Sequence, residues 1–150
     1  MIDGVTNSAT TVPAGTFPSG IAVNPLTNKI YVTNRLDNTV TVIDGQTNLT
    51  SIVPVGTLPF AIDIDVLRNQ IYVADFAGGS ITTIDGSTNT PTTVSTGNAI
   101  VNGVAVNPFT NKIYSIGLIE DDVTVLNGID SPLSPRVLQL TEGSNAEGDQ

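Results

Sequence analysis

The chain has 150 residues, a net charge of −9 and only 13% charged residues, with neither histidine nor cysteine. Its five basic residues are scattered, which argues against nucleic-acid binding and against attraction to an anionic membrane. The missing histidine and cysteine exclude Ser-His-Asp and Cys-His nucleophiles and the usual ligands of zinc, copper and haem. No apolar run is long enough to insert across a bilayer, and the N-terminus lacks the pattern of a signal peptide.

The chain opens inside a repeated unit. Ile2-Asp3-Gly4 recurs as Ile43-Asp44-Gly45, Ile84-Asp85-Gly86 and Leu126-Asn127-Gly128, at intervals of 41, 41 and 42 residues. After the first of these units, Ala9 to Ala14 is predicted to form a strand. A repeat of this length that is made of short strand-like segments is typical of propeller blades.

The first full copy covers residues 17–56 and the second covers residues 58–97. In the second copy, alternating apolar residues and turn residues predict four strands. These strands are expected at Phe60 to Val66, Gln70 to Asp75, Ser80 to Asp85 and Thr92 to Thr96. The sequence therefore predicts a four-stranded unit for each copy and almost no helix.

The third copy is placed at residues 101–140, which makes residues 1–140 one propeller segment with about thirteen strands. Residues 141–150 have no strand pattern and read as a flexible acidic tail. The predicted fold class is an all-β propeller of about three four-stranded blades. Three blades form only part of a ring, so we expect closure either by self-association or by further blades of a longer parent chain.

Residues typical of turns separate the predicted strands within each copy. Asn24-Pro25 and Asn107-Pro108 suit the first two positions of a type I turn. The Asp-Gly and Asn-Gly pairs are expected to allow a positive φ at the hairpin that follows each of them. Turn chemistry is also the preferred explanation for the recurring Asp44, Asp85 and Asn127.

One segment carries a family resemblance. Tyr31-Val32-Thr33-Asn34, with Val23-Asn24-Pro25 before it and Val40 to Gly45 after it, resembles the YVTN family of β-propeller repeats. The resemblance covers most of the chain from Ile2 to about Leu140, with departures at Ala74-Asp75 and at Ser115 to Gly117. It implies four-stranded blades around an axis and an extracellular or cell-surface location. Other propellers of similar repeat act as lyases, lactonases or redox partners.

Two carboxylates on the second copy's first strand form a candidate metal site. Asp63 stands where the other copies have Ala22 and Ala105, and Asp65 replaces Asn24 and Asn107. Both lie on the same side of a strand near the presumed channel, so they are candidate ligands of Ca²⁺ or Mg²⁺. The alternative is structural: Asp65 caps a turn, and Asp63 is hydrogen-bonded or pairs with Arg68.

Other departures from the repeat are candidate contacts for a protein or glycan partner. Phe76 precedes a glycine-rich turn and is a candidate recognition aromatic at a loop. Glu120, Asp121 and Asp122 form an acidic run on the third copy's hairpin, which is either solvated or a rim contact to a basic partner. The three tyrosines, Tyr31, Tyr72 and Tyr114, share one repeat position and are expected to pack as wedges between blades.

No catalytic constellation emerges from these residues. The leading hypothesis is a non-catalytic propeller scaffold or interaction module with no cofactor, which associates with itself to complete a ring. The alternatives are a fragment of a metal-dependent lyase or lactonase, using Asp63 and a bound cation, and a ligand- or carbohydrate-binding propeller. The oligomeric mass of the chain is the observation that most sharply separates them.

Overall fold

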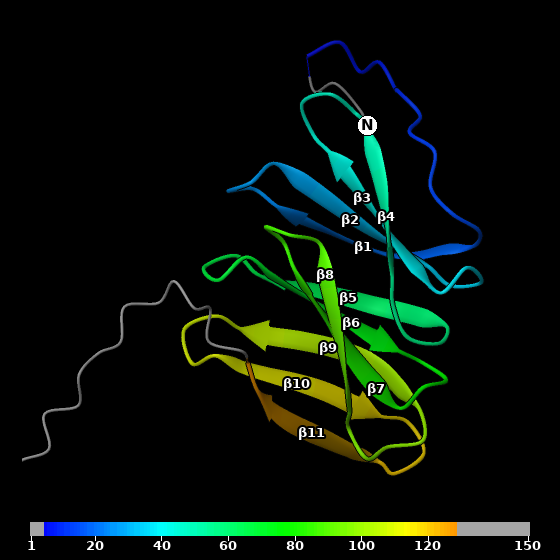
Figure 1. The fold of residues 1–150 in the computed structure, drawn as a ribbon, viewed down its shortest axis with the longest axis vertical. Helices are drawn as coiled ribbons and strands as arrows, with labels where there is room; N and C mark the ends of the chain where they lie inside the picture. Colours follow the sequence, from blue (N-terminus) through cyan, green and yellow to red (C-terminus); the bar gives the residue numbers. More distant parts are fainter. Residues whose placement is uncertain (1–4, 129–150) are drawn as a thin grey trace, which may run out of the picture.

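The computed structural model describes residues 5–128, which form eleven strands in three antiparallel sheets (Figure 1). Each sheet is one blade, and its strands follow one another by hairpins. Blade 1 contains β1 (Pro18–Asn24), β2 (Lys29–Asn34), β3 (Thr39–Asp44) and β4 (Thr50–Pro54). Blade 2 contains β5 (Pro59–Asp65), β6 (Gln70–Asp75), β7 (Ser80–Asp85) and β8 (Thr90–Ser95). Blade 3 contains β9 (Val101–Asn107), β10 (Lys112–Gly117) and β11 (Asp122–Asn127).

The predicted all-β propeller is confirmed, as an open stack of blades without a closed ring. Two strands differ from the prediction at both ends: β5 starts and ends one residue earlier, and β8 runs from Thr90 to Ser95. The predicted strand from Ala9 to Ala14 is wrong, since only Ala9 makes an isolated bridge. Residues 129–140 and the predicted tail at 141–150 lie outside the described residues, as does Ile2-Asp3-Gly4.

The blades stack through their first strands. β1, β5 and β9 lie side by side in that order (Figure 1). Side chains alternate across a strand, so each blade has two faces. We call the face toward the next blade in the chain the leading face, and the face toward the preceding blade the trailing face. In blade 1, Tyr31, Val40 and Val42 belong to the leading face, while Ile21 and Val23 belong to the trailing face.

Two apolar clusters hold the stack together, one between each pair of neighbouring blades. Between blades 1 and 2, the leading face with Tyr31 packs against Ile64, Ile71 and Ile84. Between blades 2 and 3, Tyr72 and Ile81 pack with residues such as Ile113. The tyrosines of the first two blades are therefore wedges between blades, as their repeat position predicts.

The turns are stabilised mainly by side-chain oxygens that accept backbone N–H groups, and less by the conformational freedom of glycine. The Oδ1 atoms of Asn24 and Asn107 each accept two backbone N–H groups of the turn that follows, as predicted. Asp44 and Asp85 cap their turns in the same way. A positive φ occurs in the hairpin after each described Asp-Gly pair, as predicted, and the residue that adopts it is an asparagine. It falls on Asn residues three positions after the Asp-Gly glycines, at Asn48 and Asn89, and at Asn28, Asn69 and Asn111.

Gly45, Gly86 and Gly128 are needed for close packing and not for a positive φ. A Cβ at Gly45 would overlap the Oδ1 atom of Asn28, and the glycines of the other two blades face Asn69 and Asn111 in the same manner. The glycine of each Asp-Gly or Asn-Gly pair therefore makes room for the turn asparagine of the neighbouring hairpin. This spatial coupling between two turns of one blade explains why both residues recur together.

Candidate functional site

Polar links join blade 1 to blade 2 at one rim of the stack. The side-chain amide of Asn24 donates to Oδ1 of Asn69 over 2.8 Å, and Lys29 Nζ donates to the carbonyl oxygen of Gly86 over 2.9 Å. The hydroxyl group of Tyr31 is buried beside them. Burial and the nearby charge of Asp85 raise the pKa of Tyr31 to about 12, so the phenol stays neutral at physiological pH.

Different residues join blade 2 to blade 3. The Oδ2 atom of Asp63 accepts the backbone N–H of Val106 over 2.8 Å, across the junction. Arg68 donates from Nη1 to the carbonyl oxygen of Pro108 over 2.7 Å and to Oδ2 of Asp65 over 2.9 Å. The residues that break the repeat in blade 2 are therefore the ones that attach blade 3.

These contacts also show the structural roles of the two candidate metal ligands, Asp63 and Asp65. Asp63 Oδ1 accepts the N–H of Ile64, so both of its oxygens are hydrogen-bonded. Asp65 is buried, caps the turn through Leu67 and Arg68, and pairs with the Arg68 guanidinium. No group of three or more carboxylates, histidines or cysteines suited to a metal ion forms within residues 5–128. This geometry supports the alternative in which Asp65 caps a turn and Asp63 is hydrogen-bonded, and Arg68 pairs with Asp65 and not with Asp63.

One buried position is filled differently in all three blades. In blade 1, Asn34 donates from Nδ2 to the hydroxyl groups of Thr39 and Thr41, at 3.0 and 2.8 Å, and accepts the N–H of Gly15 at 3.0 Å. Thus one neutral carboxamide satisfies two hydroxyls and the segment that leads into the blade.

In blade 2 the same position is Asp75, which is fully buried. Its Oδ2 accepts from Ser80 and Thr82 at 3.0 and 2.7 Å, so the direction of these hydrogen bonds is reversed relative to blade 1. Oδ1 has no hydrogen-bond partner in the described structure. Burial raises the pKa of Asp75 to about 6, against the opposing hydrogen bonds from Thr82, Ser80 and Gly56.

In blade 3 the position is Gly117, and a side chain from another segment fills the space. Asn98 occupies the place of a Cβ at Gly117. It donates from Nδ2 to Asp122 over 2.8 Å and accepts from Thr124 over 3.2 Å. A carboxamide is thus restored in blade 3 from the connecting loop. Sequence comparison registers both departures but cannot identify Asn98 as the substitute, because the two residues are nineteen positions apart.

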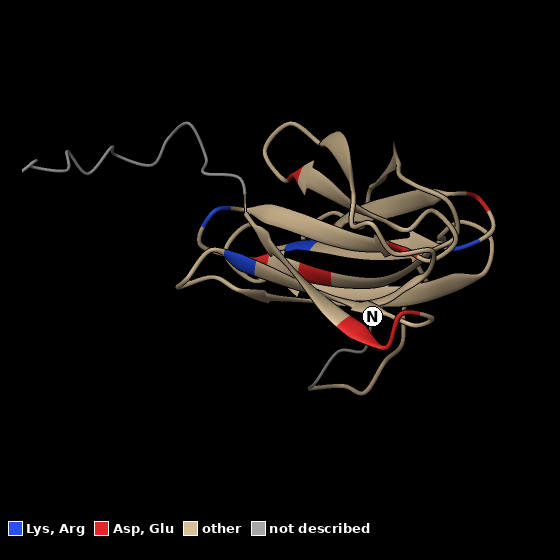
Figure 2. Cartoon of the chain, turned by 90° about the horizontal axis from the view of Figure 1, so that it is seen from below, with Lys and Arg blue, Asp and Glu red and all other residues tan. Residues whose placement is uncertain are grey.

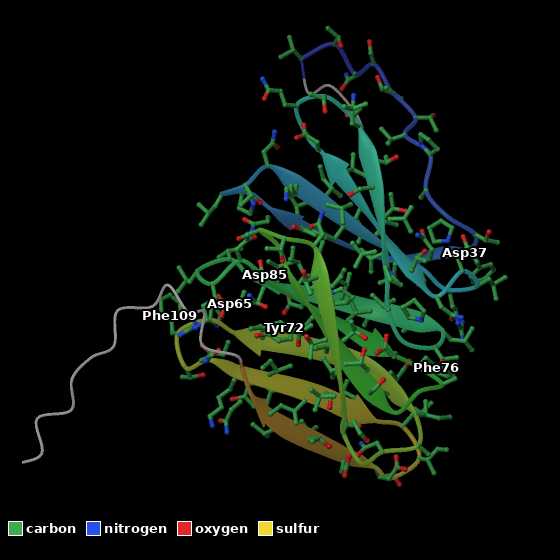
Figure 3. The ribbon with its side chains drawn as sticks, in the orientation of Figure 1. Asp37, Asp65, Tyr72, Phe76, Asp85 and Phe109 are labelled. Carbon is green, nitrogen blue, oxygen red and sulfur yellow. The ribbon has the colours of Figure 1, made fainter. Side chains whose placement is uncertain are left out.

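Phe76 lies in the turn that follows β6, at one end of blade 2 (Figure 3). It is half-buried, with its ring centroid 6.1 Å from that of Phe60. The Arg35 guanidinium lies 4.9 Å from the Phe76 centroid and 5.4 Å from that of Phe60. This cation–π contact gives Phe76 an internal partner in blade 1. The sequence did not indicate that Arg35 would meet these rings.

The acidic run of blade 3 is partly engaged. Glu120 accepts the N–H of Ala99 over 2.8 Å, and Asp122 accepts from Asn98. Asp121 is exposed and adopts a positive φ of 54° at the hairpin. Two of the three carboxylates therefore hold the loop that enters blade 3. Figure 2 shows the few charged residues mostly near the strand ends and turns, with the sheet surfaces largely uncharged.

The leading face of blade 3 meets no described blade. Tyr114 is 37% exposed, whereas Tyr31 and Tyr72 at the same repeat position are 0% and 2% exposed. Ile116, Val123 and Val125 share this face and are each at least half exposed. An apolar face of this kind on a sheet is a mark of an interaction surface.

The trailing face of blade 1 is open too. Ile21 and Val23 on β1 are 69% and 54% exposed, and Ile52 on β4 lies in the same cross-strand row as Ile21. The equivalent residues of blade 2, Ile62 and Ile64, pack in the cluster against blade 1. The described stack thus ends in one open apolar face on each side.

A groove of about 300 Å³ opens between the outer parts of blades 2 and 3. Its lining is mostly apolar and includes Tyr72, Ile81, Ile113 and Leu126. Val94 of β8 borders it and is 47% exposed, whereas Val53, its counterpart in β4, is 2% exposed. The second junction is therefore more open than the first at its outer side.

Comparisons with known proteins support the fold and leave the family open. No family model matches the chain. The PE-PGRS family protein PE_PGRS18 of Mycobacterium tuberculosis is 59% identical over 32 residues, which are 21% of this chain and 7% of that protein. The similarity to the YVTN family therefore rests on the residues of the repeat alone. Within residues 5–128 no helix has the length and apolarity needed to cross a membrane.

Solved propeller-like structures superpose on most of the chain. Hydrazine synthase of Kuenenia stuttgartiensis matches with a TM-score of 0.71 and 21% identity, over 84% of this chain and 42% of that one. A chain of a nidogen/laminin complex matches with a TM-score of 0.63 and 15% identity, over 74% and 43%. The chain spans less than half the length of either structure. At these identities the likeness shows that the fold is that of a β-propeller segment.

Proposed function

We propose that this chain is a non-catalytic β-propeller module, a scaffold and interaction unit that self-associates through its two open sheet faces. The observation that carries the proposal is the pair of apolar faces at the ends of the described stack. Residues such as Tyr114 and Ile21 are exposed there, while their counterparts at the internal junctions are packed between blades. Covering these faces removes apolar surface from water, which favours association.

The other polar departures from the repeat support a structural role over catalysis. Asp63, Asp65 and Arg68 bind main-chain groups or one another at the second junction. Asp75 is buried among hydroxyl groups. No described observation favours a metal-dependent lyase or lactonase over this module. The apolar lining of the groove beside Val94 suits an apolar segment better than a sugar, which needs more polar contacts.

An extracellular or cell-surface location is part of the proposal. It rests on the resemblance of the repeat to YVTN propellers. The low content of charged residues and the absence of cysteine are compatible with it. The location is tested separately, by fractionating cells that express the full-length natural protein.

The mass of the chain in solution tests the self-association. Sedimentation equilibrium is expected to give twice the chain mass of 15.5 kDa. Val125→Arg places a charge on the open face of blade 3 and is expected to give a folded monomer. Its far-ultraviolet circular dichroism should match that of the unsubstituted chain. A stable, soluble monomer of the unsubstituted chain, across the micromolar range, contradicts the proposed role.

A further inference from the structure

Four residues of the leading face of blade 1 that lie at the first junction recur on the leading face of blade 3. Gly20, Asn24, Lys29 and Tyr31 in blade 1 correspond to Gly103, Asn107, Lys112 and Tyr114 in blade 3. In blade 2 the same positions are Ala61, Asp65, Gln70 and Tyr72, so three of the four residues differ. Blade 3 thus carries the docking residues of blade 1, although no described blade lies against them.

At the first junction these residues have defined roles. Asn24 donates to Asn69, and Lys29 donates to the carbonyl oxygen of Gly86. Gly20 lies close to the neighbouring main chain, because a Cβ there would be 2.5 Å from the carbonyl oxygen of Phe60. The set therefore recognises a receiving face that offers an asparagine, a free turn carbonyl and a close strand.

The trailing face of blade 1 offers the same groups. Asn28 stands where blade 2 has Asn69, and their φ angles are 52° and 53°. Gly45 stands where blade 2 has Gly86, and each faces the Oδ1 atom of its turn asparagine. Asn28 is exposed and Gly45 is half-buried, whereas Gly86 is buried under Lys29. These acceptors of blade 1 are accessible.

Charge favours the same pairing. Lys29 lies beside the second blade's turn, which contains Asp85, and the corresponding turn of blade 1 contains Asp44. Backbone hydrogen bonds from Thr47 and Gln46 lower the pKa of Asp44, which keeps this exposed carboxylate ionised. Lys112 currently folds back onto Asn127 of its own blade. Its described contact lies within its own blade, and blade 1 carries the Asp44 carboxylate in the turn that corresponds to the Asp85 turn of blade 2.

We propose that two copies of this chain associate head to tail, with the leading face of blade 3 in one copy on the trailing face of blade 1 in the other. This arrangement rests on the self-association proposed above and specifies its geometry. Lys112 Nζ donates to the carbonyl oxygen of Gly45 in the second copy, and the Asn107 amide donates to Asn28. Applied twice around a two-fold axis, the same contact closes both ends of each copy.

Cysteine crosslinking tests the arrangement, because the chain has no cysteine of its own. At the second junction the Arg68 side chain reaches Pro108 in the next blade, which brings the two turns together. By the repeat, the turn at Thr110 of one copy lies beside the turn at Leu26 of the other. Both residues are exposed. Leu26→Cys and Thr110→Cys variants are therefore suitable, each alone and as an equimolar mixture, with a short bismaleimide.

Crosslinked dimers are expected in the mixture and not with either variant alone. Dimers from Thr110→Cys alone contradict the head-to-tail arrangement and indicate that like faces meet. If sedimentation shows a dimer but the mixture gives no crosslink, this arrangement is wrong while the self-association stands. A monomer in sedimentation contradicts both, and then the open faces belong to further blades of a longer chain.

A substitution at the proposed contact gives a second readout. Lys112→Gln is expected to weaken dimerisation by about a hundredfold, because the symmetric dimer loses two hydrogen bonds from a charged donor and each is worth about tenfold. Lys112→Arg keeps the charge and the donors and should retain most of the affinity. The thermal stability of the separated monomer should change little, since the contact of Lys112 with Asn127 is exposed. Equal dimer affinity for the Gln variant and the unsubstituted chain would rule out the Lys112 contact.

Discussion

The two junctions of this chain solve the same packing problem with different residues. The first joins blades 1 and 2 through a neutral amide pair, Asn24 with Asn69, and through Lys29 on a turn carbonyl. The second uses the Asp63 carboxylate on a main-chain N–H and the Arg68 guanidinium on Pro108. The apolar wedge, a tyrosine, is the same in both. The tyrosine that packs between blades is thus the same at both junctions, whereas all of these polar contacts between blades differ.

The junctions also differ in how completely they are covered. Val53 is buried in the first, whereas Val94 borders the open groove of the second. The second junction therefore depends more on its inner strands and on Asp63 and Arg68. Substitutions at matched positions should reveal this difference.

Removing a tyrosine wedge should have the largest effect. Tyr31→Ala and Tyr72→Ala each leave a cavity, which typically costs about 3–5 kcal/mol for a large aromatic residue. Tyr114→Ala, on the open face, should cost less than about 2 kcal/mol in the monomer. Urea unfolding of all three variants, in the monomeric Val125→Arg background, provides the measurement. An equal cost at Tyr114 would mean that its face is already covered within the chain.

Asp75→Asn should remove a pH dependence that blade 1 lacks. The pKa of Asp75 is about 6 in the folded chain and 3.8 as an ordinary carboxyl, so folding favours its protonated form. The stabilising effect of that proton is complete below about pH 4 and is lost as the pH rises through 6. At about 1.4 kcal/mol per pKa unit, the ionised form is destabilised by on the order of 3 kcal/mol.

The asparagine variant should therefore stabilise the chain at pH 8 and have little effect at pH 4. Its amide can donate to Ser80 and Thr82 as Asn34 donates to Thr39 and Thr41. Thermal melts across this pH range give the measurement, with Asp121→Asn as the control for loss of an exposed charge. A stabilisation that is equal at both pH values would show that Asp75 does not titrate in this window.

The sequence predicts most of this fold, because each repeat carries its own turn and packing residues. Asn24, Asp44 and Tyr31 recur at fixed spacing, and their local chemistry determines hairpins and wedges without reference to distant segments. The segment from Ala9 to Ala14 does not form the predicted strand, because beyond one bridge at Ala9 no strand within residues 5–128 pairs with it.

The polar contacts between blades are harder to predict from the sequence. Asp63 and Asp65 stood out as departures, but a departure does not reveal whether its partner is a cation or the next blade's main chain. The partner of Asp63 is the N–H of Val106, a group that every residue except proline has. Likewise Asn98 replaces the carboxamide missing at Gly117 from another part of the chain. Such contacts follow from the stacking of blades, not from the repeat.

Asp63→Ala should weaken the second junction selectively. Alanine is the residue of blades 1 and 3 at this position, so the strand itself should tolerate it. The N–H of Val106 would lose its acceptor, which costs about 1–3 kcal/mol when the group stays buried. Hydrogen exchange should show faster exchange in β9 with little change in β1. Uniform acceleration across all three blades would contradict a role confined to this junction.

Arg68→Gln should have a smaller effect. The guanidinium links Asp65 to Pro108 but is partly exposed, so solvent screens its charge. We expect a loss of about 1 kcal/mol, because the glutamine amide can still donate one hydrogen bond to the buried carboxylate of Asp65. The loss should shrink at high salt, whereas that of Asp63→Ala should not. A salt-independent loss would show that the hydrogen bond to Pro108, and not the ion pair, is the main contribution of Arg68.

Calcium should have the smallest effect, a change in the melting midpoint below about 1 °C. Binding a cation would require Asp63 to release Val106 and Asp65 to release Arg68, because a site needs about six to eight oxygens. Binding to the folded state would raise the midpoint with the logarithm of the ratio of the calcium concentration to its dissociation constant. Melts in millimolar calcium, with Asp63→Ala alongside, provide the test. A rise that the substitution abolishes would show that a cation competes with blade 3 for the Asp63 carboxylate, and the second junction would then be a calcium-dependent contact.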